Sequence, residues 1–395
     1  MKSKQIILSI VLCAILMLDA AHIAAQSLTS EQNKAITGAK QGGIIKLKGF
    51  PLKDLPLIDY EKIILPGPQY IISDDPEYID VLEGIAVREA VLPGAVRLYV
   101  YNVNAVVKPK KMDRKIIAVI KNTGNSVMHL QILRCSTQEP STNYYHIGKQ
   151  GLADFFASKP AEKVRTAEPG EVIAIDKTLE EKNVKYNELV HGIYEFVIDQ
   201  PGEVSVVQTD PESTGLEALS RVKGVLPSSH RNAGRGLFGV SNYRIIIQDT
   251  IRTEHFPATL IVADGKDDPW VIGWDSSTGQ SAKLAGNYGV MYQVEMKWLS
   301  SDDRGLAMIT YNATAGARWC DGMANAMVIS EGKFLEGIIQ LPSDKLITTG
   351  APEVVLVQLF KPGEKGEVQT IRFTYSPPGA SCMPIPIVFI PVQME

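Results

Sequence analysis

The order of apolar and polar residues along the chain is the strongest structural signal, and it is typical of β-strands. Between residues 288 and 298 every even position is apolar or aromatic, whereas the odd positions include Gln293, Glu295 and Lys297. Because successive side chains of a strand point to opposite faces, this alternation predicts a strand with one buried face. The same alternation occurs in residues 128–132 and 194–198.

Other apolar runs show no alternation, which predicts strands that are buried on both faces. These runs are residues 116–120, 244–247, 258–263 and 354–360. Pro-Gly and Asn-x-Gly steps separate the runs, and such steps favour tight turns. Short strands between turns, with few helices, predict an all-β fold of the sandwich or barrel type.

Helical patterns are few and local. Residues 151–159 and 177–185 predict short helices, and residues 211–223 carry apolar side chains at helical spacing. All three segments are brief interruptions of a strand-dominated pattern.

A lapse of the strand pattern suggests how the chain is divided. Residues 227–236 are small, polar and rich in glycine, serine and arginine, which is typical of a linker. We therefore predict two β-sandwich (jelly-roll-like) domains. The predicted segments are an N-terminal arm over 26–43, a first domain over 44–210, a linker with a short helix over 211–236, and a second domain over 237–395.

The first 25 residues have the pattern of a secretory signal peptide. Lys2 and Lys4 precede an apolar run over residues 6–18, which Asp19 closes. The run is shorter than the roughly 20 residues that a membrane-spanning helix needs. We expect cleavage after Ala25 and export to the cell surface or extracellular space (the periplasm in a Gram-negative cell), with no membrane span in the mature chain.

Composition narrows the classes of partner. With 45% hydrophobic residues the chain can bury enough apolar surface to fold, which argues against intrinsic disorder. The net charge of −4 and the lack of a long basic run argue against nucleic acid as a partner. The sequence contains no GxSxG, HExxH, CxxC or GxxxxGK[ST] motif, and we expect no cofactor.

The cysteines suggest one disulfide. Cys13 lies in the signal segment, so three cysteines remain in the mature chain, and an exported compartment permits disulfides. Cys320 and Cys382 both lie in the C-terminal half, and we favour a bridge between them. Cys135 ends an apolar strand and is expected to be a buried free thiol.

The best local candidate for a ligand site is the loop over residues 228–239. It brings His230, Arg231 and Arg235 together with three glycines. Arginine binds carboxylate or sulfate groups bidentately, and glycine lets a ligand approach the backbone. One interpretation is an anion or acidic-sugar site at the domain junction. The other, which we favour, is a flexible linker whose arginines are solvated or paired with acidic neighbours.

Aromatic residues form a second candidate. Trp270 and Trp274 share a face with Ile272 if residues 269–275 form a strand. Two exposed tryptophans would make a platform for sugar rings, but the usual burial of tryptophan favours a core face. Tyr144 and Tyr145 lie in a polar stretch that we expect to be a loop, with one of the two exposed.

An acidic cluster is the third candidate. Asp264, Asp267 and Asp268 offer oxygen ligands to calcium, but the segment lacks the register and the terminal glutamate of an EF-hand. We favour a turn with solvated aspartates. The histidines are scattered without metal-ligand spacing, and no metal site is predicted.

Several stretches in sequence order carry a resemblance to a known group of proteins. They are residues 82–86, 97–102, 117–124, 285–290 (Ala-Gly-Asn-Tyr-Gly-Val) and 369–378. In this order the chain resembles an uncharacterised family of exported bacterial proteins that is common in cyanobacteria and found in some Gram-positive relatives. The resemblance implies an exported β-rich protein and brings no activity with it.

The hypothesis that these patterns favour is an exported, non-enzymatic binding or assembly protein of the cell surface or extracellular matrix. Its expected partners are a cell-envelope polysaccharide or another surface protein, and a homo-oligomer is compatible with the pattern. In an assembly role, the apolar tail over residues 385–392 would be donated to a neighbouring chain, although Pro384, Pro386 and Pro391 argue equally for a protected edge. One alternative is a carbohydrate-binding protein or glycan-active hydrolase. A second alternative is a metal-dependent extracellular enzyme.

Overall fold

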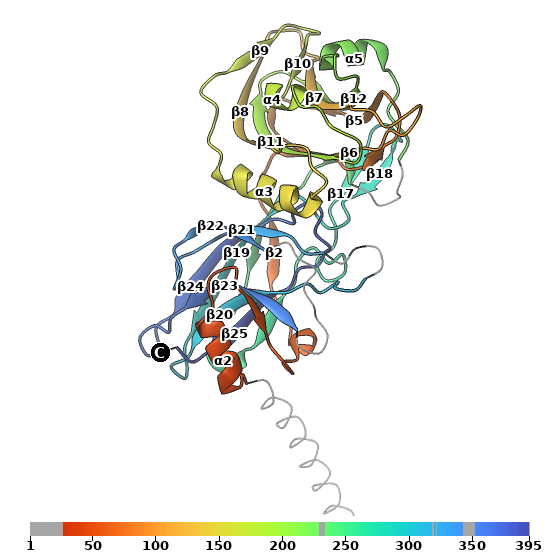
Figure 1. The fold of residues 1–395 in the computed structure, drawn as a ribbon. Coiled ribbons are helices and arrows are strands. Elements are labelled where there is room, and N and C mark those ends of the chain that lie inside the picture. Colours follow the sequence, from red (N-terminus) through yellow and green to blue (C-terminus); the bar gives the residue numbers. More distant parts are fainter. Residues whose placement is uncertain (1–26, 229–233, 318–319, 321, 343–351, 395) are drawn as a thin grey trace, which may run out of the picture.

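The computed structural model describes residues 27–228, 234–317, 320, 322–342 and 352–394. The predicted signal peptide, His230 and Arg231 lie outside the described residues. The described chain is mostly β, as the alternation predicted. Its strands form four sheets, with nine, four, seven and five strands (Figure 1).

Two sheets form the upper half of the molecule in Figure 1. The nine-stranded sheet has the order β18 (Gln280–Lys283), β17 (Ile272–Asp275), β13 (Arg235–Phe238), β3 (Gln69–Ser73), β6 (Gly94–Asn104), β11 (Leu189–Ile198), β8 (Met128–Thr137) and β9 (Arg165–Ala167), with β4 (Tyr78–Ile79) beside β6. The four-stranded sheet has the order β10 (Val172–Ala174), β7 (Lys115–Asn122), β12 (Gly202–Thr209) and β5 (Gly84–Val91). Buried residues of both sheets form one hydrophobic cluster between them.

The other two sheets form the lower half. The seven-stranded sheet has the order β2 (Glu61–Ile64), β14 (Asn242–Ile246), β19 (Met291–Leu299), β24 (Gln369–Tyr375), β21 (Asn325–Ile329) and β22 (Gly337–Leu341), with β15 (Ile251–Arg252) beside β19. The five-stranded sheet has the order β1 (Ile44–Lys46), β23 (Glu353–Phe360), β20 (Gly305–Thr310), β25 (Ile387–Val392) and β16 (Ala258–Leu260). Their shared core continues upward onto the lower face of the nine-stranded sheet.

Short helices cover the ends and faces of these sheets. They are α2 (Ser30–Thr37), η1 (Leu52–Asp54), α3 (Tyr144–Ala157), α4 (Lys177–Glu180), α5 (Gly215–Arg221) and η2 (Thr253–His255). Helix α2 lies in the predicted N-terminal arm and begins at a capping box, in which Thr29 and Gln32 satisfy each other's backbone amides. With η1 it covers the outer face of the five-stranded sheet.

Strand pairing crosses the predicted linker. Strand β1 pairs with β23, and β2 pairs with β14, so early strands complete sheets made mainly of late ones. In the other direction, β13 pairs with β3, and β17 and β18 extend the same sheet. The borders of the sheets therefore do not coincide with a single break near residues 211–236.

Helix α3 lies where the two halves meet (Figure 1). It packs on β8 and β11 above and on β21 and β22 below. The carbonyl oxygen of Gly379 approaches Gly148 so closely that an added Cβ would lie 2.2 Å from it. A side chain at position 148 would therefore push α3 away from the segment around Gly379.

Most of the patterns that predicted strands are confirmed. One is corrected, and the run of residues 258–263 forms a strand only as far as Leu260. Strand β19 alternates between buried and exposed side chains, and β7 and β23 are buried on both faces. Strand β14 is buried on one face only, because Arg244 points to solvent between neighbours that face the core. The apolar run of residues 244–247 was therefore misread as doubly buried.

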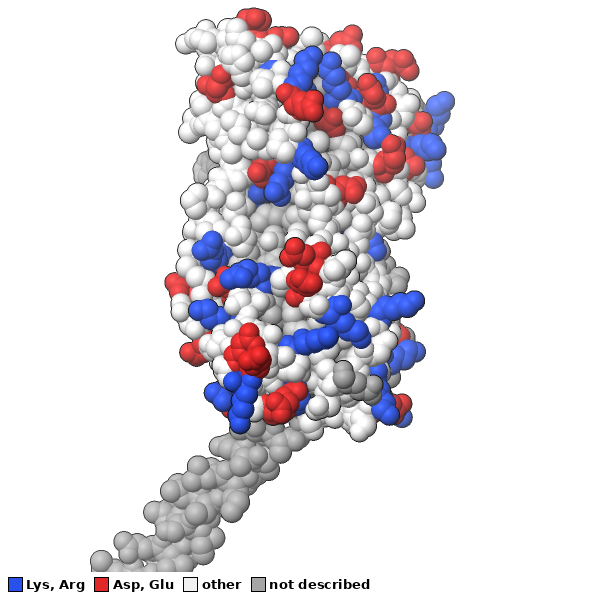
Figure 2. Space-filling view, turned by 90° about the vertical axis from the view of Figure 1, so that its left-hand side faces the viewer, with Lys and Arg blue, Asp and Glu red and all other residues white. Residues whose placement is uncertain are grey.

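The apolar tail forms β25, which hydrogen-bonds to β20 on one side and to β16 on the other within the same chain. Among the described residues no helix is long and apolar enough to cross a membrane. On the face shown in Figure 2, acidic and basic side chains are interspersed rather than gathered by sign.

Candidate functional site

A cavity of about 440 Å³ lies at the junction of the two halves and is rich in tyrosine. Its described lining consists of Asp74, Glu77, Tyr78, Tyr99, Tyr101, Tyr144, Tyr145, Tyr288, Cys320, Gly379, Ala380 and Ser381. We call this the tyrosine cavity. Its volume falls in the range of about 300–1,000 Å³ that is usual for small-molecule sites.

Separate elements supply the six tyrosines. Tyr99 and Tyr101 are two residues apart on β6, so their side chains leave the same face of the sheet. Tyr144 and Tyr145 begin α3, where the Asn143 side chain caps the helix by accepting a hydrogen bond from the third amide, that of His146. The other two come from β4 (Tyr78) and from the loop before β19 (Tyr288).

Hydrogen bonds hold several of these rings in place. The bonds run from the Tyr288 hydroxyl to the Ser381 carbonyl (2.7 Å), from the Tyr144 hydroxyl to the Asn187 carbonyl (3.0 Å), and from the Gly379 amide to the Tyr99 hydroxyl (2.8 Å). Rings that are fixed in this way lose little further freedom when a ligand binds, so the cavity is preorganised.

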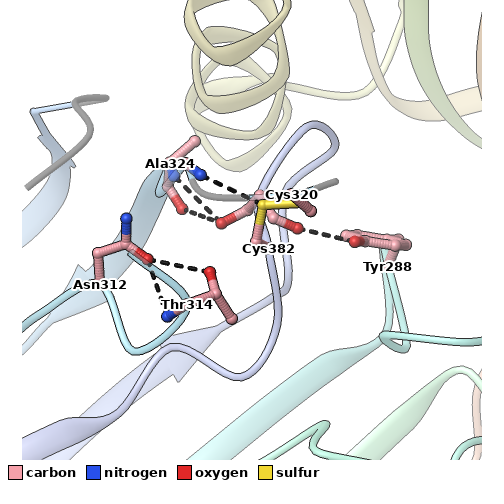
Figure 3. The surroundings of a disulfide bond; sticks show 8 residues. Tyr288, Asn312, Thr314, Cys320, Ala324 and Cys382 are labelled. Atoms are coloured by element: carbon pink, nitrogen blue, oxygen red, sulfur yellow. Dashed lines mark hydrogen bonds between the residues drawn. A yellow bond between two sulfur atoms is a disulfide. The ribbon is translucent and has the colours of Figure 1, made fainter. Parts of the chain in front are cut away.

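One wall of the cavity is held by the disulfide between Cys320 and Cys382, which confirms the predicted pairing. Figure 3 shows Tyr288 reaching toward this wall. Next to the bridge, the Ser381 hydroxyl donates to the Ala324 carbonyl (3.0 Å) and accepts from the Ala324 amide (3.1 Å). The backbone of residues 379–382 is therefore fastened both covalently and by hydrogen bonds.

The Asp74 carboxyl group of the cavity has a strongly perturbed pKa. Burial raises the pKa of Asp74 well above its ordinary value, and the nearby negative charges of Glu77 and Asp75 raise it further. Burial, followed by the charges of Asp74 and Glu77, also raises the pKa of Tyr288. The Tyr288 phenol therefore stays neutral at physiological pH.

His191 lies directly behind the tyrosine wall. Its ring is fully buried, and its centroid is 4.9 Å from that of Tyr99 and 5.9 Å from that of Tyr101. Its Nδ1 lies 3.0 Å from the Val100 carbonyl oxygen, so we assign the proton to Nδ1. Burial lowers the pKa of His191 to about 4.

This buried histidine makes stability depend on pH. The unfolded chain takes up a proton at His191 near pH 6.5, whereas the folded chain resists it until about pH 4. We expect the free energy of unfolding to fall by about 2–3 kcal/mol between pH 6.5 and 4.5 on account of this residue. Chemical denaturation at several pH values would measure the effect.

A matched pair of variants isolates the contribution of His191. His191→Gln cannot take up the proton, so its stability should change less with pH in this window than that of the unmodified protein. His255→Gln makes the same change at an exposed position and should leave the pH dependence unaltered. If the free energy of unfolding changed with pH equally in all three proteins, the result would contradict a lowered pKa of His191 in the folded chain.

The structure places Arg235 in the core rather than in a flexible linker. Its side chain is 2% exposed and lies on β13. The guanidinium donates to the Asp275 carboxylate (2.7 and 3.0 Å), to the Leu226 carbonyl (2.7 Å) and to the Asp75 carbonyl (3.2 Å). The Arg235 guanidinium therefore donates its hydrogen bonds to acceptors of the protein itself, although one interpretation of the sequence placed it in a site for an anionic ligand.

The tryptophans do not share one environment. Trp274 is 52% exposed and Ile272 is exposed beside it on β17, so the expected core face is corrected. The reason is position: β5 of the facing sheet packs against β3 and β13, and β17 lies beyond β13 toward the end of the sheet. Trp270 precedes the strand and is half-buried, with its ring against Gly265.

The aspartate cluster forms a turn, as favoured, although one of its members is buried rather than solvated. Asp264 accepts hydrogen bonds from the amides of the residues that follow it. Asp268 is buried, pairs with Lys62, and accepts from the Tyr292 hydroxyl (2.7 Å). Within the described parts of the chain, no group of three or more His, Cys, Asp or Glu side chains is placed to hold a metal ion.

Cys135 is exposed and unpaired in the described structure, which corrects the expected buried thiol. The residue lies near the end of β8, where Arg134 is also exposed. The apolar pattern that ends near residue 132 therefore does not extend to the cysteine.

Sequence reasoning missed the tyrosine cavity. Tyr144 and Tyr145 were expected in a loop, but α3 begins at Tyr144, seven residues before the predicted helix. Tyr99 and Tyr101 were visible as a same-face pair on a strand. No local pattern, however, relates that pair to Tyr288, which is more than 180 residues away along the chain.

Comparisons with known proteins add little. Neither the protein-family models nor the curated proteins gave a match. Among solved structures, the chain is similar to the oxalate decarboxylase of Lactobacillus farciminis in its formate complex, with 10% identity over 84% of this chain and 87% of that one. The TM-score of that pair is 0.14, which is too low to inform fold or function.

Proposed function

We propose that the protein is an exported, non-enzymatic binding protein of the cell surface or extracellular matrix that takes a small ligand into the tyrosine cavity. The observation that carries the proposal is the cavity itself, with its six tyrosines and two carboxylates converging from distant segments. A cavity with an aromatic lining and a few polar groups is the usual form of a small-molecule site.

The remaining parts of the proposal concern architecture and location. The nine- and four-stranded sheets would form one jelly-roll-like sandwich domain, and the seven- and five-stranded sheets the other. The disulfide is consistent with an oxidising compartment outside the cytoplasm. Membership of the uncharacterised exported family, and a polysaccharide, surface-protein or homo-oligomeric partner, remain predictions.

The test is a ligand screen with a variant that opens the cavity. Saturation-transfer NMR with a panel of amines, neutral sugars, carboxylates and aromatic alcohols should identify at least one binder. The double variant Tyr78→Ala/Tyr144→Ala removes two half-exposed rings of the lining and should weaken that binder about tenfold or more. Tyr186→Ala removes a half-exposed ring outside the lining and should leave binding unchanged.

The exposure of Trp274 favours an alternative function, that of a carbohydrate-binding protein. The same screen distinguishes this alternative from ligand binding in the tyrosine cavity. Sugar binding that survives the cavity variant and is lost in Trp274→Ala would place a glycan on β17 and contradict the cavity proposal. A panel in which nothing binds would also contradict it.

A further inference from the structure

A second cavity, of about 710 Å³, lies beside the edge strands of both lower sheets, β2 and β16. One wall is residues 56–61, which bridge to β16 at Leu57 and then enter β2. The other wall includes residues 247–251, which connect β14 with β15. We call this the edge cavity. It shares no described lining residue with the tyrosine cavity, and its volume is within the usual range for small-molecule sites.

The floor of the edge cavity is aliphatic. Ile58, Ile247 and Ala258 line it and are buried members of the core of the lower half. Ile251 also lines it and packs against that core, and Leu57 is 52% exposed at its border. An alkyl chain placed on these side chains would leave water, and the transfer of each methylene from water is favourable.

Carboxylates form much of the polar rim. Asp59, Glu61 and Asp249 belong to the lining and are exposed. Glu61 accepts a hydrogen bond from the Gln248 side chain (2.6 Å), which is a neutral donor and leaves the negative charge uncompensated. Among the described residues, the side chains of Asp59 and Asp249 form no ion pair. The rim therefore carries three negative charges beside an apolar floor.

Basic groups offset little of this charge. In the described lining the one basic side chain is that of His255. Arg252, which follows Ile251 in the chain, is paired with Glu254 (3.0 Å). A positively charged head group would therefore complement the rim, whereas a carboxylate or sulfate head group would be repelled. Because the rim is exposed, this preference should be modest and should weaken with added salt.

We propose that the edge cavity binds a small amphiphile that has an alkyl chain and a protonated amine. The chain lies on the aliphatic floor, and the ammonium group lies beside the carboxylates of the rim. This is a second site, and it does not depend on ligand binding in the tyrosine cavity. The alkyl chain provides most of the affinity, and the charge of the head group provides the selectivity.

The experiment compares three ligands with the same chain and different head groups: octylammonium, octanol and octanoate. In calorimetric titrations of the full chain at low salt, octylammonium should bind about fivefold more tightly than octanol and about tenfold or more above octanoate. High salt should reduce these ratios. Hexylammonium should bind more weakly than octylammonium, by about two- to fourfold for each methylene that it lacks.

One pair of variants tests the apolar floor. Leu57→Ser removes an exposed apolar side chain from the lining and should weaken all three eight-carbon ligands by about threefold. Leu216→Ser makes the same change on α5, at a position that is 57% exposed and outside the lining, and it should leave the affinities unchanged. Thermal unfolding of each variant verifies that it is folded.

A second pair tests the charged rim. Asp59→Asn/Asp249→Asn removes two charges at exposed positions and should weaken octylammonium about threefold while leaving octanol unchanged. Asp80→Asn/Asp113→Asn removes two exposed charges outside the lining and should alter neither affinity.

The outcomes separate this inference from the proposed function. An absence of octylammonium binding, octanoate binding as tightly as octylammonium, or normal binding by Leu57→Ser would each overturn the edge cavity as an amphiphile site. Loss of octylammonium binding in Tyr78→Ala/Tyr144→Ala would overturn it as well, because the ligand would then occupy the tyrosine cavity. Octylammonium binding that is unchanged in that variant supports the edge cavity and leaves the proposed function to its own screen.

Discussion

Replacing Arg235 by methionine is expected to lower the free energy of unfolding by about 3–5 kcal/mol. The change leaves Asp275 without its charged partner in a buried site, and an uncompensated buried charge is strongly destabilising. Burial alone would raise the pKa of Asp275, but hydrogen bonds from Ser277 and Arg235 outweigh it and keep the pKa below its usual value. Urea denaturation at pH 7 would measure the loss.

Two comparisons make the result interpretable. Arg372→Met removes the arginine of an exposed ion pair with Glu295 (3.0 Å) and should cost less than about 1 kcal/mol. The double variant Arg235→Met/Asp275→Leu removes both buried charges and should recover part of the loss. If Arg235→Met were no more harmful than Arg372→Met, the buried pair would not be a structural element.

Removing the disulfide has the second large effect. The variant Cys320→Ser/Cys382→Ser opens a loop whose ends are 62 residues apart, and the entropy of closing such a loop predicts a loss of about 4 kcal/mol in the free energy of unfolding. Because the bridge fastens residues that line the tyrosine cavity, ligand affinity should fall as well. Thermal unfolding with and without a reducing agent provides an independent measurement.

Cys135→Ser is the matched control for this variant. Its thiol is exposed and forms no bridge, so the substitution should change stability by less than about 0.5 kcal/mol. A reducing agent should destabilise Cys135→Ser as much as the unmodified protein. Equal stability of the oxidised and reduced forms would contradict a structural role for the bridge.

Both predictions concern the surroundings of the cavity. The Arg235 guanidinium donates a hydrogen bond to the carbonyl of Asp75, the neighbour of Asp74. The carbonyl of Gly234, the residue before β13, accepts a hydrogen bond from the Asp74 amide. The disulfide fastens the opposite segment, residues 379–382. The buried ion pair of Arg235 thus lies beside one part of the tyrosine cavity, and the disulfide forms part of another. Preorganised binding requires support of this kind.

Local patterns predicted strands reliably and packing partners poorly. The alternation in β19 and the doubly apolar run of β7 identified these strands. Successive side chains of a strand point to opposite faces, so burial of one face gives alternation and burial of both faces gives a continuous apolar run. Arg235 was misjudged because its neighbours are small and polar. Its burial depends on Asp275, which is 40 residues away and joins it only when β13 pairs with β17.

The sequence by itself predicted the β character of the chain and the positions of several long strands, and it favoured the cysteine pair that the structure shows. Side-chain periodicity and turn residues act over a few positions, so a linear reading captures them. Only the tertiary structure decided the tyrosine cavity. Its tyrosines come from β4, β6, α3 and the loop before β19, and long-range strand pairing across the predicted linker brings these elements together. Contacts between residues far apart in sequence depend on which sheet edges meet, and no local pattern encodes that choice.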